Sequence, residues 1–97
     1  MRTREKKYSD YGITEERKKA LYEYCHASPD IELVTIAAMY SNFPLHKLLI
    51  RSLINGESWR TLSHKEYIPA GEKDFYGYRR KALGNLNALL IGKGIQI

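Results

Sequence analysis

The side chains in this 97-residue sequence that could perform covalent or metal chemistry are few and scattered. The single cysteine, Cys25, precedes His26, but neighbours on a helix point in different directions and do not form a nucleophile–base pair. His46 and His64 stand alone, and the carboxylates fall mainly where helices are expected to begin, which capping explains. The sequence also has no glycine-rich phosphate loop. We therefore expect a protein that is not an enzyme and that holds no metal or cofactor.

The segment that does carry chemical information is basic and rich in tyrosine, and it covers residues 73–84. On a helical wheel, one side gathers Lys73, Tyr76, Gly77, Arg80 and Gly84. Each internal glycine costs about 1 kcal/mol relative to alanine, so two on one exposed face predict that another molecule approaches it closely. Because Arg, Lys and Tyr contact phosphates, DNA is the natural candidate. The alternative is an ordinary solvated face on which the glycines have no role.

The charge distribution agrees with an acidic partner. The chain carries 16 basic and 11 acidic residues, a net charge of +5. Residues 1–49 hold eight basic and seven acidic residues, whereas residues 50–97 hold eight basic and four acidic residues. The excess therefore lies in the second half, which favours nucleic acid or an acidic protein surface as partner. A net charge of this size is also compatible with a soluble basic protein that binds neither.

Helices are the predicted elements throughout. Thr14 predicts the start of a helix over residues 15–26, and Ser28-Pro29-Asp30 predicts the start of a second, whose residues 31–39 are apolar nearly all round. We expect this second helix to be the buried central one. Apolar spacing over residues 45–53 predicts a third helix, which Asn55-Gly56 would end.

Two further helices complete the prediction. Ser58 predicts a short fourth helix of about two turns, with Trp59 and Leu62 packed in the core. After a connection over residues 64–71, the longest helix follows over residues 73–91, with an apolar stripe at Phe75, Tyr78, Ala82, Leu83, Leu86, Leu89 and Leu90. The sequence thus predicts an all-α bundle of about five helices, with residues 13–97 as one domain and residues 1–12 as an appended N-terminal arm.

The order of the last three predicted helices is that of a helix-turn-helix, and two segments carry a resemblance. Residues 53–63 (LINGESWRTLS) resemble the entry to helix-turn-helix domains of the sigma-factor region-four type. Residues 74–83 (DFYGYRRKAL) are similar to the recognition helix of small phage regulators of the ArpU type. The whole chain also resembles small proteins encoded in prophages of Gram-positive bacteria. It departs from the pattern between Ser63 and Lys73, where the link is longer than the usual turn.

The resemblance implies a role for several residues. The fourth predicted helix would support the fifth, and Arg60 would contact backbone phosphate. The fifth would read DNA with Lys73, Tyr76, Arg79, Arg80 and Lys81, although the wheel puts Arg79 near the edge of the core. The basic arm, with Arg2, Arg4, Lys6 and Lys7, could enter a minor groove or could simply be solvated.

We therefore expect a non-catalytic, phage-type transcriptional regulator that binds DNA. One alternative is a phage-encoded inhibitor of the anti-CRISPR type, which would use the same basic face against a host nucleic-acid machine. Another is a small protein-interaction module. The charged start lacks a following apolar segment, and no apolar run is long enough to cross a bilayer, so we expect a cytoplasmic protein without a membrane partner.

Overall fold

The computed structural model describes residues 2–27 and 30–97, and every regular element in these ranges is a helix. The predicted all-α class is confirmed. The α-helices are α1 (Glu15–His26), α2 (Ile31–Ser41), α3 (His46–Asn55), α4 (Trp59–Lys65) and α5 (Glu72–Gly92). Three 3₁₀ helices accompany them: η1 (Thr3–Glu5), η2 (Tyr8–Tyr11) and η3 (Phe43–Leu45).

Local capping sets most of the helix boundaries. The Thr14 hydroxyl accepts a hydrogen bond from the Arg17 N–H at 3.1 Å, and the Ser58 hydroxyl accepts one from the Thr61 N–H at the same distance. Gly56 ends α3 with a φ of 71°. For α2 the cap is the Asp30 carboxylate, which accepts from the N–H groups of Glu32 and Leu33, so this helix begins at Ile31. The predicted cap and proline, Ser28 and Pro29, lie outside the described residues.

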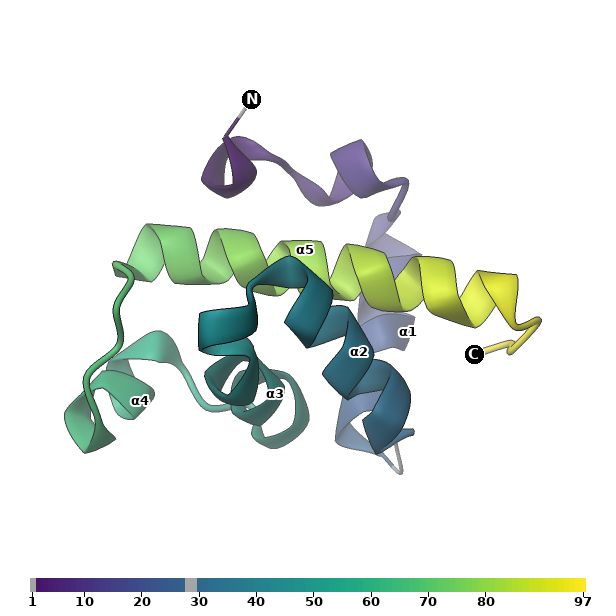
Figure 1. The fold of residues 1–97 in the computed structure, drawn as a ribbon. Coiled ribbons are helices and arrows are strands. Elements are labelled where there is room, and N and C mark those ends of the chain that lie inside the picture. Colours follow the sequence, from purple (N-terminus) through teal and green to yellow (C-terminus); the bar gives the residue numbers. More distant parts are fainter. Residues whose placement is uncertain (1, 28–29) are drawn as a thin grey trace.

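The central helix is α5, not α2 as the sequence predicted. Figure 1 shows the N-terminal arm on one side of α5 and α2, α3 and α4 on the other. Glycine, alanine and leucine positions of α5 are buried toward both sides, whereas Ile31 and Tyr40 of α2 are exposed. The reason is length: at about 1.5 Å per residue, the longest helix is the one that can reach every other element.

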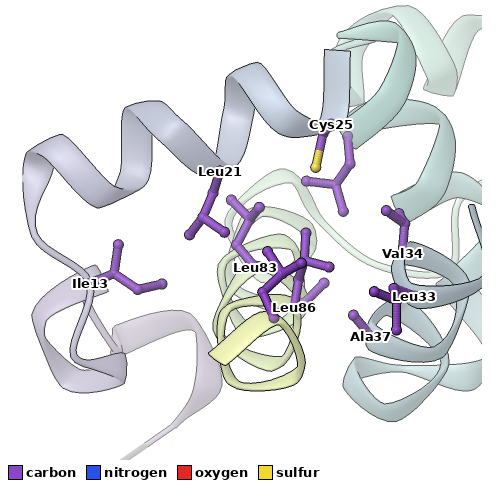
Figure 2. Close-up of a cluster of buried hydrophobic side chains, with 11 residues drawn as sticks. Ile13, Leu21, Cys25, Leu33, Val34, Ala37, Leu83 and Leu86 are labelled. Atoms are coloured by element: carbon purple, nitrogen blue, oxygen red, sulfur yellow. The ribbon is translucent and has the colours of Figure 1, made fainter. Parts of the chain in front are cut away.

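The core consists of two neighbouring clusters that α5 connects. The first, shown in Figure 2, joins α1, α2 and the second half of α5. Its buried residues are Ile13, Leu21, Cys25, Leu33, Val34, Ala37, Leu53, Ala82, Leu83, Leu86 and Leu90. The second gathers Ala38, Leu45, Leu48, Leu49, Leu62, Ile68 and Phe75, with Trp59 packed against it as predicted. Burial of these apolar surfaces is the main stabilising contribution to the fold.

Residues 2–12 pack on the domain instead of extending from it. Tyr8 and Tyr11 lie against the first core cluster, and the Tyr8 and Tyr22 hydroxyls are hydrogen-bonded at 2.8 Å. The Lys18 ammonium lies 4.9 Å from the centre of the Tyr8 ring. The arm is therefore part of the folded structure, and it covers one side of α5.

Candidate nucleic-acid interface

The α5 face that bears Gly77 and Gly84 was expected to be exposed, and this expectation is wrong. Both glycines are buried beneath the arm. A Cβ on Gly77 would lie 2.6 Å from the Arg4 Cα, and a Cβ on Gly84 would lie 2.7 Å from Cδ1 of the Tyr11 ring. The close approach that the two glycines predicted is real, but the approaching group is the protein's own N-terminus. Neither glycine is accessible to DNA while the arm is in place.

Arg80 holds the arm against this face. Its Nε donates to the Lys6 carbonyl at 2.9 Å, and its Nη2 donates to the Arg4 carbonyl at 3.0 Å. Hydrogen bonds from a charged donor are stronger than neutral ones, so the guanidinium acts first as a clamp. The prediction that Arg80 lies free on a solvated face is therefore wrong.

Arg79 and Tyr76 also take part in packing. The Arg79 guanidinium lies 5.0 Å from the centre of the Tyr22 ring and 5.6 Å from that of the Tyr76 ring. The Tyr76 hydroxyl accepts a hydrogen bond from the Trp59 N–H at 3.1 Å and so ties α5 to α4. These two residues join helices to one another, and both side chains are half-buried.

The remaining predicted site residues reach solvent. Lys73 on the first turn of α5 and Arg60 on α4 are exposed, and Lys81 is half-buried. They do not share one helix face: Arg60 belongs to α4, while Lys73 lies on the side of α5 that the arm covers. Arg60 thus lies on a separate helix, as predicted, while the α5 residues that were predicted to share one exposed face differ in burial.

One of these surfaces is a pocket where the arm meets the first half of α5. Its charged lining consists of five basic residues and one acid, with Tyr8 beside them: Arg4, Lys6, Lys7, Lys73, Arg80 and Glu5. Arg4 also lies 3.8 Å from the Asp74 carboxylate, a half-buried ion pair that balances part of the positive charge. We call this surface the basic pocket. The basic residues of the arm were the sequence signal for this pocket. Their spacing along the arm did not show that they would lie against α5.

Three of the four candidate reactive side chains, those of Cys25, His26 and His46, are engaged in packing or hydrogen bonds. Cys25 is buried in the first core cluster, and burial raises the pKa of its thiol to about 11, which makes it a poor nucleophile. Nδ1 of His26 lies 3.1 Å from the Ile54 carbonyl, and Nδ1 of His46 lies 2.6 Å from the Phe43 carbonyl. Within residues 2–27 and 30–97, no three His, Cys, Asp or Glu side chains are grouped to hold a metal ion.

Comparison with known proteins adds no assignment: no protein-family model, curated protein or solved structure matches the chain. Among the described helices, none combines the length and the hydropathy needed to span a bilayer. Function is therefore inferred from the residues and from their arrangement.

Proposed function

We propose that the protein binds DNA through the basic pocket and acts as a non-catalytic regulator of the phage type. The observation that carries the proposal is the convergence of five cationic side chains, from two segments far apart in the sequence, on one surface that Glu5 alone lines with a carboxylate and that Asp74 approaches only at Arg4. Neutralising phosphates with such groups releases condensed counterions, which supplies most of the affinity of non-specific DNA binding.

The test is binding of a short fluorescent duplex, measured by anisotropy over a range of salt concentrations. Lys7 and Lys73 are exposed residues of the pocket, so the double variant Lys7→Ala/Lys73→Ala should remove two phosphate contacts and leave the fold intact. We expect the slope of log affinity against log salt to fall by about two. The matched control is Lys19→Ala/Lys93→Ala, which removes the same charge from exposed positions outside the pocket. Equal losses in both double variants would contradict a specific role for the pocket.

A different observation favours a second candidate function, a protein that binds another protein. Tyr40 is 78% exposed and Phe43 is 59% exposed, and together with Ile36 and Met39 they line an apolar depression on the outer side of α2 and η3. Exposed aromatic residues are enriched at protein interfaces. An inhibitor of the anti-CRISPR type would combine this apolar surface with the basic pocket to occupy a host nucleic-acid machine.

A pull-down from host lysate, with and without nuclease, separates the two candidates. Partners that disappear after nuclease treatment indicate binding through nucleic acid. Partners that persist, and that Tyr40→Ala/Phe43→Ala removes, indicate direct binding to protein. The aromatic double variant is the deciding one, because both candidates use the basic pocket and the lysine double variant would weaken both.

A further inference from the structure

Helix α2 has the composition of a helix that is enclosed on every side, but the described part of the chain covers only one side of it. Residues 31–45 carry a single charged side chain, Glu32, in a chain that is 28% charged. A helix that is apolar all round is typical of a buried position. In the structure α2 packs on α5 and α3 through four fully buried apolar residues: Leu33, Val34, Ala37 and Ala38. Its opposite side is left uncovered.

The uncovered side of α2 is apolar and aromatic. Four residues line a shallow depression there, and we call them the α2 patch: Ile36, Met39, Tyr40 and Phe43. The two aromatic residues are exposed, and the two aliphatic ones are half-buried. Apolar surface of this kind gains free energy when it leaves water, and the gain is roughly proportional to the area covered.

Phe43 is held in position before anything binds to it. The Asn42 side-chain oxygen accepts a hydrogen bond from the Leu45 N–H at 3.2 Å and so caps η3. The His46 ring lies 4.8 Å from the Phe43 ring, centre to centre, and its Nδ1 lies 2.6 Å from the Phe43 carbonyl oxygen. A side chain that is already ordered loses less conformational entropy on binding. Phe43 is therefore suited to be an anchor of an interface.

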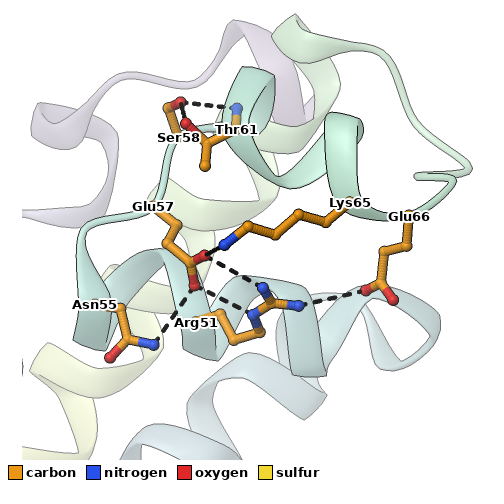
Figure 3. A network of polar contacts seen from close by, with 7 residues as sticks. All are labelled: Arg51, Asn55, Glu57, Ser58, Thr61, Lys65 and Glu66. Atoms are coloured by element: carbon orange, nitrogen blue, oxygen red, sulfur yellow. Dashed lines mark hydrogen bonds and ion pairs between the residues drawn. The ribbon is translucent and has the colours of Figure 1, made fainter.

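The neighbouring surface, where α3 meets α4, differs because its charges are paired within the chain (Figure 3). The Glu57 carboxylate accepts from Nε and Nη2 of Arg51, both at 3.2 Å, and from the Lys65 ammonium at 2.8 Å. Arg51 belongs to α3 and Lys65 is the last residue of α4, so Glu57 links the two helices. These charges are balanced by intramolecular contacts, whereas the α2 patch leaves water only when another molecule covers it.

The charges around the α2 patch favour a second copy of this chain as that molecule. The net charge of +5 makes two copies repel each other at long range, but the patch itself carries no charge. Glu32 lies four residues before Ile36 and therefore on the same helix face, and Lys47 follows the patch on the first turn of α3. Both are exposed. When the α2 helices of two copies lie antiparallel about a two-fold axis, Glu32 of each copy approaches Lys47 of the other.

We propose that two copies of the chain associate through the α2 patch, with their α2 helices antiparallel. A fully exposed aromatic side chain presents about 150 to 250 Å², so Tyr40, 78% exposed, and Phe43, 59% exposed, together present roughly 200 to 350 Å². A standard interface buries about 800 Å² on each partner, as an apolar centre within a polar rim. The patch can supply the centre of a small interface, with Glu32 and Lys47 in the rim. The dimer should therefore be weak and dependent on concentration.

The test is sedimentation equilibrium of the full chain from about 1 to 500 μM, the range in which a small interface dissociates. We expect the average mass to rise from that of one chain toward that of two. Tyr40→Ala/Phe43→Ala should raise the dissociation constant at least about 10-fold, because both anchors are lost. Tyr67→Ala is the matched control, since Tyr67 is 86% exposed but lies outside the patch. Circular dichroism and the thermal midpoint check that each variant is folded.

The two rim charges test the antiparallel arrangement independently. Glu32→Lys alone, or Lys47→Glu alone, should raise the dissociation constant by about 2- to 10-fold, because each places like charges opposite one another at two symmetric contacts. The double variant Glu32→Lys/Lys47→Glu exchanges the charges and should restore association. A partner of different sequence would not respond to this exchange, so restoration indicates a second copy of the chain.

The outcomes separate this inference from the proposed function. A monomer at every concentration, a dimer that Tyr40→Ala/Phe43→Ala does not weaken, or a charge exchange that fails to restore association overturns the inference. A monomeric chain that captures a host protein through the aromatic pair also overturns it. Figure 1 places the arm, and with it the basic pocket, on the other side of α5 from α2. DNA binding is therefore measured separately, by anisotropy at concentrations too low for association, and stands or falls by itself.

Discussion

A Cβ built on Gly77 would lie 2.6 Å from the Cα of Arg4, which means that the backbones of α5 and the arm are in direct contact. A glycine in the middle of a helix normally costs stability, and here the absence of a side chain is what allows the arm to dock. The arm and α5 therefore form a single packed surface, and each contact in it can be tested by substitution.

Gly77→Ala should release or displace the arm. The expected gain in helix propensity is about 1 kcal/mol, but a backbone contact this short leaves no room for a methyl group. Trypsin should cleave after the basic residues of the arm faster than in the unmodified protein. Gly92→Ala is the matched control, because nothing lies within 4 Å of a Cβ at that position. Equal cleavage rates in the two variants would mean that the arm does not depend on this contact.

Arg80→Ala should loosen the arm by a different route. It removes two charged hydrogen bonds to the carbonyls of Lys6 and Arg4, each of a type worth roughly 1.5 to 3 kcal/mol where it is well shielded from water. Amide hydrogen exchange should accelerate in η1 and η2. Lys81→Ala, a substitution one residue along the same helix, should change stability by no more than about 0.5 kcal/mol. Unchanged exchange in Arg80→Ala would show that the clamp is not needed.

Leu86→Ala should lower the free energy of unfolding by roughly 2 to 5 kcal/mol, because the side chain is completely buried and its removal leaves a cavity. Urea denaturation followed by circular dichroism measures this value. Ile91 on the same helix is 64% exposed, so Ile91→Ala should cost much less. Similar losses for both substitutions would contradict the observed packing of α5.

Glu57→Gln should alter how stability depends on pH. Hydrogen bonds from Arg51 and Lys65 lower the pKa of the Glu57 carboxyl from its ordinary value of 4.5 to about 2. Because the folded-state pKa is the lower one, the stabilisation is fully present above about pH 4.5 and is lost as pH falls toward 2. The thermal midpoints of the two proteins should therefore differ near neutral pH and converge in acid. A difference that is constant over this pH range would be inconsistent with an ionised Glu57 as the link between α3 and α4.

The sequence by itself determined the features that depend on neighbouring residues. Thr14 and Ser58 cap the helices that they were predicted to start, and Gly56 ends the helix that it was predicted to end. Capping and apolar spacing act within a few residues, so a pattern read along the chain is sufficient to find them. The all-α class followed from these local signals.

Tertiary structure alone decided which segment covers each face of α5. The two glycines of α5 predicted a close neighbour, but the neighbours of Gly77 and Gly84 are Arg4 and Tyr11, each 73 positions earlier in the chain. The same is true of the basic pocket, whose lysines come from the arm and from α5. A helical wheel separates the two sides of one helix, but it cannot distinguish a side that faces water from one that faces a distant part of the same chain, because both tolerate arginine, tyrosine and glycine.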